Sequence, residues 1–402
     1  MVSESFLKRV LMFIGFILSG LITLIFISTP ESLQVPVPDS VPTITTKSSL
    51  AREFDEAKLF FESSIKTQIP GSSLASVVSW SPNSKYILAN LRFIDPSGGT
   101  TRPYIMDLSR KLYVVVPNAT WIDAASWSGT KIAYVANNGY SYFDVETNES
   151  ATFGSPVSAG PVVDLSTPVI SGDGAYIAYN AGGLAVYSLK ASKSIQLNQH
   201  NDDVPLLWKS DDKTLLISTG AGAERSLSEF HIGTRALRTI AALPQSISRA
   251  KWVAKDQLAL LTLGFDDGYF DYAANLKTNS LSLLAETTEG IAFTSARERE
   301  MATLKGNKIT LYGSEGEKKI EAKRTDKSRI SNFELLPSPL ALFVREQGDA
   351  YDVATFNMTT LIETAVEDIW LPYVIVSPNG KSAVTVKEGN DSAQFVDLPN
   401  AS

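Results

Sequence analysis

Residues 78–88 read VSWSPNSKYIL, and the order of apolar and turn-forming residues in them predicts the fold. An apolar segment ends in Trp80, and a tight turn of serine, proline and asparagine follows it. Each of these residue types favours a reversal of the backbone through its own conformational preference. A second apolar segment begins at Lys85, so the stretch predicts a β-hairpin whose first strand ends in tryptophan.

The same pattern recurs along the chain. Clear copies read ASWSGTKIAY at 125–134, VISGDGAYIAY at 169–179 and VIVSPNGKSAV at 374–384, and weaker copies lie at 207–213, 251–256, 292–295 and 335–339. The aligned anchor positions, which follow the tryptophan or its substitute in most copies, are 81, 128, 171, 210, 254, 295, 338 and 377. Their average spacing of about 42 residues is typical of a propeller blade with four strands.

The eight copies predict an all-β fold, a β-propeller of eight four-stranded blades over residues 74–402. Seven blades are the alternative, if one weak copy is an insertion. The last copy ends at its third strand, so closing the ring would take a strand from upstream, near residues 65–73. The spacing of apolar residues over 50–65 instead predicts a short amphipathic helix, and the segment 50–73 is left open between the two.

The repeats resemble TolB-like and WD40-like β-propeller repeats, whose core reads W-S-P-D-G-K before an apolar strand and a later Y-x-x-D-L-like strand. Here the later strand reads YIMDL at 104–108, YFDV at 142–145 and QFVDL at 394–398. The resemblance covers about four fifths of the chain and implies a fold, because such repeats serve many functions. An anchor followed by eight blades also resembles the N-terminal region of the dipeptidyl-peptidase IV family. The catalytic domain of that family would follow its propeller, and none follows here before Ser402, so no peptidase activity is carried over.

The N-terminus predicts a membrane anchor. Residues 10–27 read VLMFIGFILSGLITLIFI without a charge, which gives about 27 Å of helix against a bilayer core of about 30 Å. Lys8 and Arg9 precede this run, so the positive-inside rule places the N-terminus in the cytoplasm and the remainder outside the cell membrane. Residues 1–28 are therefore expected to be a single-pass signal anchor, with a cleaved signal peptide as the alternative. Residues 29–49, rich in proline, serine and threonine, read as a linker.

Composition excludes several kinds of chemistry. The chain has no cysteine and only two histidines, His200 and His231, so thiolate nucleophiles, disulfides and multi-histidine metal sites are excluded. Its formal charge of -7 argues against a nucleic-acid-binding surface. No G-x-S-x-G elbow occurs. We therefore expect no enzyme activity, no catalytic or metal-binding residues and no cofactor, and we interpret the charged run 315–329 as a solvated outer strand and loop.

Two loops are candidates for binding a partner. The loops between the second and third strands of copies one and five, residues 89–103 and 264–270, are distinctive in length and composition. In an eight-bladed ring these copies lie opposite each other, so the two loops would flank the mouth of the central funnel. Arginine and aromatic residues are common interface anchors, and the loops carry Arg92, Phe93, Arg102, Phe265, Tyr269 and Phe270. The alternative is that these aromatic side chains fold onto their own blades.

These features together predict a membrane-anchored extracytoplasmic propeller that acts as a protein–protein interaction or scaffold module at the cell envelope. Its expected partner is an envelope or cell-surface protein, and the membrane is contacted through the N-terminal helix. The alternative function is an extracytoplasmic enzyme or carbohydrate-binding protein with a site in the central funnel. Propellers can assemble such a site from residues far apart in the sequence, so the lack of a motif does not exclude it.

Overall fold

The computed structural model describes residues 72–399, apart from residues 96–97, 137–138, 155–166, 198–202, 221, 266–267, 288–291, 298, 349, 370–373 and 388–391. All described residues belong to a single compact unit. The predicted anchor, the linker and the segment before residue 72 lie outside the described residues. Within the described part of the chain, no helix is long and apolar enough to cross a membrane.

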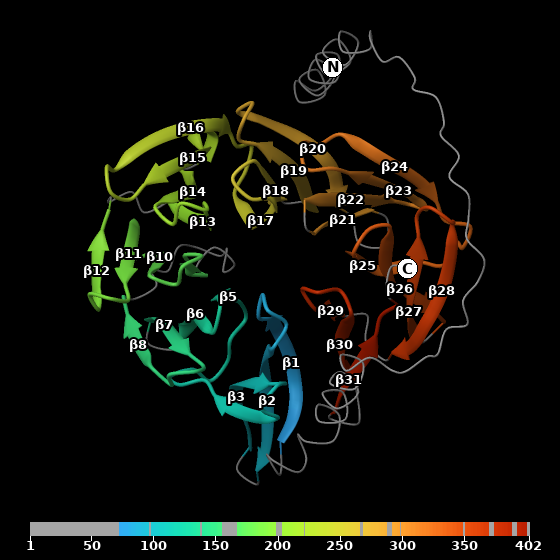
Figure 1. Ribbon diagram of the computed structural model, residues 1–402, viewed down its shortest axis with the longest axis horizontal. Coiled ribbons are helices and arrows are strands. Elements are labelled where there is room, and N and C mark those ends of the chain that lie inside the picture. The colour runs from blue at the N-terminus through green and yellow to red at the C-terminus, as the bar shows by residue number, and fades with distance from the viewer. Residues whose placement is uncertain are drawn as a thin grey trace, which may run out of the picture. The chain divides into compact units, whose positions relative to one another are not determined.

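Eight antiparallel sheets follow one another around a central axis, each forming one blade of a β-propeller (Figure 1). Blades 1 to 4 are formed by β1 (Ser72–Trp80), β2 (Tyr86–Asp95), β3 (Gly98–Asp107) and β4 (Leu112–Val115); β5 (Ala125–Ser128), β6 (Lys131–Ala136), β7 (Gly139–Asp144) and β8 (Ser150–Phe153); β9 (Val169–Ile170), β10 (Tyr176–Asn180), β11 (Leu184–Ser188) and β12 (Lys193–Gln196); and β13 (Val204–Trp208), β14 (Thr214–Thr219), β15 (Ser226–His231) and β16 (Ala236–Ala242). Blades 5 to 8 are formed by β17 (Ile247–Ala254), β18 (Leu258–Phe265), β19 (Gly268–Asn275) and β20 (Ser280–Thr287); β21 (Ala292–Arg297), β22 (Glu300–Lys305), β23 (Lys308–Tyr312) and β24 (Lys318–Lys323); β25 (Ile330–Leu335), β26 (Leu340–Gln347), β27 (Ala350–Asn357) and β28 (Ile362–Ile369); and β29 (Ile375–Val376), β30 (Ser382–Lys387) and β31 (Ser392–Asp397).

The prediction of eight blades is confirmed, and the seven-blade alternative is wrong. Every weak copy of the repeat forms a complete blade, because its strands pair in the same order as those of the clear copies. Blades 1 to 7 have four strands each, whereas blade 8 has three within the described residues. The first strand of each blade lies nearest the axis and the fourth lies on the outside (Figure 1).

The turn after the first strand is built in the same way in three of the four clear copies, those of blades 1, 3 and 8. A buried serine hydroxyl accepts the backbone N–H of the residue five positions later: Tyr86 to Ser81, Tyr176 to Ser171 and Ser382 to Ser377, at 2.9, 3.0 and 3.1 Å. The fourth turn position has a positive φ, 58° at Ser84 and 67° and 68° at Gly174 and Gly380. Glycine adopts this left-handed conformation without the steric cost that other residues meet, which explains its presence in two of the three turns.

The repeated tryptophans join neighbouring blades. Each indole Nε1 donates to the first strand of the preceding blade: Trp80 to Ile375 O (3.2 Å), Trp127 to Ser79 Oγ (2.9 Å), Trp208 to Val169 O (2.8 Å) and Trp252 to Trp208 O (2.9 Å). Their rings also pack in the apolar clusters between blades. The tryptophans therefore serve core packing between blades.

The hydrophobic core consists of eight apolar clusters, one at each boundary between neighbouring blades. The cluster between blades 8 and 1 contains Trp80, Leu91 and Phe395, and the rings of Trp80 and Phe395 meet edge to face at 6.0 Å. Apolar packing between the first and last blades therefore closes the ring. The predicted closing strand lies almost entirely outside the described residues.

An ionic network lies between blades 6 and 7. Glu363 accepts hydrogen bonds from both Arg324 (2.8 and 2.9 Å) and Arg345 (2.9 Å), and Arg345 also pairs with Asp326 and Asp352. The Arg324 side chain is only 1 % exposed and stacks over the ring of Phe343 at 4.5 Å. The interpretation of residues 315–329 as wholly solvated is therefore wrong at Arg324, because partners from the next blade compensate its burial.

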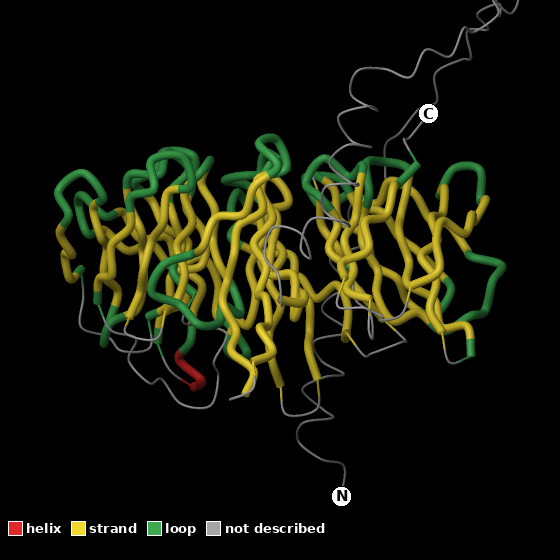
Figure 2. The backbone as a smooth tube through the Cα atoms, turned by 90° about the horizontal axis from the view of Figure 1, so that it is seen from below, coloured by secondary structure: helices red, strands yellow, loops and turns green. Residues whose placement is uncertain are grey.

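The two faces of the ring differ. One, which we call the turn face, carries the turns between first and second strands and between third and fourth strands (Figure 2, upper edge). The other, the loop face, carries the loops between second and third strands and the connections between blades. The 3-10 helix η2 (Gly222–Glu224) lies on the loop face, at the lower edge of Figure 2.

Candidate functional site

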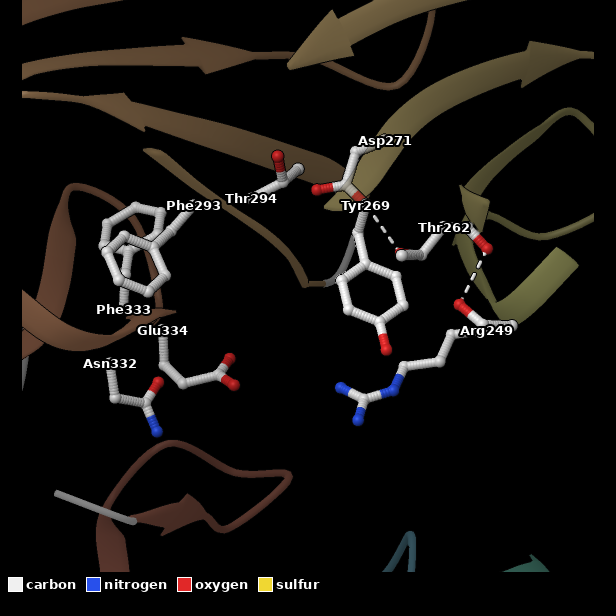
Figure 3. Close-up of a pocket in the computed structure, with 10 residues that line it drawn as sticks. Arg249, Thr262, Tyr269, Asp271, Phe293, Thr294, Asn332, Phe333 and Glu334 are labelled. Carbon is white, nitrogen blue, oxygen red and sulfur yellow. Dashed lines mark hydrogen bonds between the residues drawn. The ribbon is translucent and has the colours of Figure 1, made fainter. Parts of the chain in front are cut away.

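A pocket of about 280 Å³ opens beside the axis between blades 5, 6 and 7. Its lining comes from the loop-face ends of β17, β18, β19 and β21 and from β25: Ser248, Arg249, Thr262, Tyr269, Asp271, Phe293, Thr294, Asn332, Phe333 and Glu334 (Figure 3). Three of these strands are first strands, which form the wall of the central channel. The site therefore stands on paired β-structure, which holds side chains more rigidly than a loop does.

Arg249 provides the positive charge of the pocket. Ile247 is buried and Arg249, two residues further along β17, is exposed, because a register shift in the pairing with β18 lies between them. The backbone of Arg249 pairs with Thr262. Its guanidinium group points into the pocket beside the ring of Tyr269 (Figure 3). Within the described residues the side chain forms no hydrogen bond or ion pair, so its donors are available to a ligand.

The two carboxylates of the pocket, in contrast, have donors from the protein itself. Ser295 donates its hydroxyl to Glu334 at 2.8 Å and accepts the backbone N–H of Leu335 at 3.0 Å. Thr262 donates its hydroxyl to the buried Asp271 at 2.5 Å. Both acidic groups are thus partly satisfied before any ligand binds, whereas the arginine is not.

Aromatic rings supply the apolar part of the lining. The Tyr269 side chain is 51 % exposed, while Phe333 is buried and stacks on Phe343 with ring centroids 5.6 Å apart. Phe293 packs against the core between blades 6 and 7. The pocket therefore combines apolar walls, two hydrogen-bonded carboxylates and a guanidinium group that has no partner in the described part of the chain.

A metal centre is not formed by the described residues, because they contain no cluster of three or more acidic or histidine side chains suited to a metal ion. A second cavity of about 180 Å³ lies on blade 6, lined by Thr303, Lys305, Lys308, Thr310 and Tyr312. Lys308 already pairs with Glu321 at 2.9 Å. We assign no site there.

Among the residues predicted from blade 5, Tyr269 lines the pocket. Phe265 ends β18, and its side chain is outside the described part. Phe270 is half-buried on β19, where it pairs with Leu263 and Glu286.

The residues predicted from blade 1 lie elsewhere. Phe93 packs on its own blade, 6.1 Å from the ring of Tyr104, as the alternative interpretation has it. Arg92 and Arg102 are exposed on β2 and β3. Blades 1 and 5 face each other across the ring, and no blade 1 residue lines the pocket (Figure 1). A binding role for the blade 1 residues remains a prediction.

Sequence reasoning missed Arg249, Asn332 and Glu334. All three lie on first strands of weak copies, where the match to the repeat was too poor to place them. The available signal was a polar side chain in the middle of a first strand, at a position that faces the channel rather than the core. Arg249 and Lys251 in the segment ISRAKWVA at 247–254 are examples.

No family model matches this chain, and no curated protein matches it. Solved structures do resemble it. A eukaryotic initiation factor superimposes with a TM-score of 0.52 at 12% identity, covering 79% of this chain and 82% of that one. Porphyromonas gingivalis dipeptidyl peptidase 4 gives 0.52 at 11% identity, covering 86% of this chain and 61% of that one. The β-propeller domain of the Trilobed protease from Pyrococcus furiosus gives 0.46 at 11% identity, covering 82% and 94%.

The similar structures have different functions, and their identities to this chain are low. They include peptidases as well as an initiation factor, so neither enzymatic nor non-enzymatic function follows from the likeness. What the likeness shows is the fold alone.

Proposed function

We propose that this protein is a non-enzymatic binding module that presents the loop face of its propeller to a protein partner at the cell envelope. The N-terminal segment 1–28 tethers it to the membrane, with the propeller on the extracytoplasmic side. The observation that carries the proposal is the pocket between blades 5, 6 and 7. There Arg249, which has no side-chain partner among the described residues, lies beside the exposed ring of Tyr269. Arginine and tyrosine are enriched among the residues that dominate the energy of protein interfaces.

The turn face supports the choice of the loop face by contrast. Some of its polar groups bond between blades: Gly172 N–H donates to Asp212 at 2.7 Å, and Ser210 N–H donates to Asp256 at 2.8 Å. These groups are already satisfied. On the loop face, the side chain of Arg249 forms no hydrogen bond or ion pair with the residues that the structure describes.

Site-specific photo-crosslinking tests this proposal. A benzophenone amino acid replaces Tyr269 on the loop face, and in a second variant it replaces Leu237 on the outer strand of blade 4. The two positions are matched in exposure, at 51% and 54%. We expect position 269 to capture a discrete protein in irradiated cells and position 237 to capture none. Equal capture at both positions, or none at 269, contradicts the proposal.

A second candidate is a carbohydrate-binding protein with the same pocket. The observation in its favour is the combination of Tyr269 with Asn332 and Glu334, because sugars stack on aromatic rings and hydrogen-bond to amides and carboxylates. A glycan array probed with the full-length protein separates the candidates. Selective binding of one oligosaccharide that Tyr269→Ala abolishes favours the second candidate over the first.

A further inference from the structure

We infer that the pocket receives a single acidic side chain of the protein partner, with Arg249 as the anchor for its carboxylate. This inference rests on the proposed function and adds the chemistry that the site selects. It follows from three properties of the pocket: the positive charge of Arg249, the volume of the pocket, and the negative charge on the wall opposite Arg249.

The unpaired charge determines the sign of the ligand. Asp271 and Glu334 each accept a hydroxyl hydrogen bond from the protein, whereas Arg249 has no partner within the described residues. A guanidinium group offers donors in a planar fork that matches the two oxygens of a carboxylate. The group whose donors a ligand can engage is therefore the positively charged guanidinium of Arg249, and a negatively charged ligand matches it.

The volume determines the size of the ligand. At about 30 Å³ for each water molecule, 280 Å³ has room for roughly nine waters. Pockets for small-molecule ligands usually start at about 300 Å³. One acidic side chain with part of its backbone fits this space, and the exposed ring of Tyr269 covers the apolar part of the chain beside it.

The far wall limits the charge of the ligand. Glu334 comes from β25, while Arg249 comes from β17, and the two side chains form no ion pair. Both point into the space between these strands (Figure 3). A second negative charge on the ligand would meet Glu334, and the net charge of -7 opposes polyanions more generally. The site therefore selects one Asp or Glu among neutral or apolar neighbours, rather than a phosphate or an acidic run.

Peptide selection tests this inference on the full-length protein in lipid nanodiscs. A displayed library of random peptides is selected on the wild type, and the enriched peptides are synthesised in pairs with Asp→Asn or Glu→Gln. We expect enrichment of isolated acidic residues, with the amide partner of each pair binding about tenfold more weakly, as the loss of a charged hydrogen bond implies. Arg249→Gln should abolish this difference, and Arg249→Lys should restore part of it.

Lys251→Gln is the matched control. Lys251 lies two residues along the same strand, carries the same charge, is exposed and does not line the pocket. The inference is overturned if acidic residues are not enriched, if paired peptides bind equally, or if Lys251→Gln weakens binding as much as Arg249→Gln. Failure of this inference and failure of the proposed function can be distinguished. If the photo-crosslink from position 269 persists in the Arg249→Gln variant, the protein partner is supported and the role of Arg249 as its acidic-residue anchor is contradicted. If acidic peptides bind but no crosslink forms in cells, the anchor is supported and the protein partner is contradicted.

Discussion

The indole Nε1 of Trp80 donates a hydrogen bond of 3.2 Å to the carbonyl oxygen of Ile375, 295 residues further along the chain. The same kind of bond joins other neighbouring blades, but here it joins the first blade to the last. Closure of a propeller needs such long-range contacts, because no loop connects these two blades. The Trp80 side chain is buried, at 7% exposure, and packs against Phe395 of blade 8.

Trp80→Phe should therefore destabilise the ring at its closure. The substitution keeps an aromatic ring but leaves the partly buried Ile375 carbonyl without its donor, which costs about 1 kcal/mol of unfolding free energy. Trp127→Phe is the control, because its acceptor is the hydroxyl of Ser79, which can rotate toward another partner. Urea unfolding followed by circular dichroism measures both. If the two variants lose equal stability, the closure bond has no special role.

The sequence predicted the blades well, because each of them is a local repeat. The serine of the turn, the tryptophan and the following apolar strand can be recognised within about ten residues, and together they define a blade. The pocket could not be predicted in the same way. Arg249 and Tyr269 come from blade 5 and Glu334 comes from blade 7. Nothing in the sequence around any one of them indicates that they line the same pocket.

The ionic network shows a second limit of local reasoning. The run of charges at 315–329 is typical of a solvated segment, and most of β24 is indeed exposed. The side chain of Arg324 is buried only because Glu363 of the next blade lies beside it. A partner 39 residues away cannot be inferred from the charge pattern around the arginine.

Glu363→Gln should destabilise the boundary between blades 6 and 7. It removes one negative charge that two arginines share, and breaking a buried ion pair costs about 3–5 kcal/mol because the remaining charge stays buried. Glu321→Gln is the control. Its pairs with Lys308 and Lys318 are exposed, and exposed pairs contribute little to stability because solvent screens them. Thermal unfolding should show a clearly lower midpoint for the first variant alone, and similar midpoints would contradict a stabilising role for the network.

The same network should respond to acid through Asp326. The backbone N–H of Ser328, helped by the neighbouring arginines, lowers the pKa of the Asp326 carboxyl below its ordinary value. A lowered pKa in the folded state means that the ionised form stabilises the fold. This contribution is complete above the unfolded pKa of about 3.9 and is lost as the pH falls through the folded pKa.

The unfolding free energies of Asp326→Asn and the wild type should therefore differ near neutral pH and become similar in acid. The side chain is one-third exposed, so solvent screening keeps the difference in unfolding free energy to about 1 kcal/mol or less near neutrality. Denaturant titrations from neutral pH into the acid range should show this difference shrinking below about pH 4. A constant difference at all pH values would mean that the carboxylate charge is not what stabilises the segment.

The proposed topology predicts which parts of the protein a protease can reach. If residues 1–28 anchor the chain with its N-terminus in the cytoplasm, protease added to intact cells should remove an epitope tag at the C-terminus. A tag at the N-terminus should stay intact and remain in the membrane fraction. Protection of both tags contradicts the extracytoplasmic placement, and release of a shortened soluble form favours a cleaved signal peptide.

Two aromatic residues that the sequence placed in one predicted binding surface should behave differently. Phe93 packs with the cluster that closes the ring, so Phe93→Ser should lower the unfolding free energy by about 2 kcal/mol through lost apolar burial. Tyr269 is half exposed, so Tyr269→Ser should leave stability within about 0.5 kcal/mol of the wild type and weaken partner capture. Chemical denaturation measures the stability of each variant, and crosslinking from Ser248 in the same pocket measures its partner capture. If Phe93→Ser lost capture without losing stability, a binding role for blade 1 would be supported. Unchanged capture in Tyr269→Ser would contradict a binding role for blade 5.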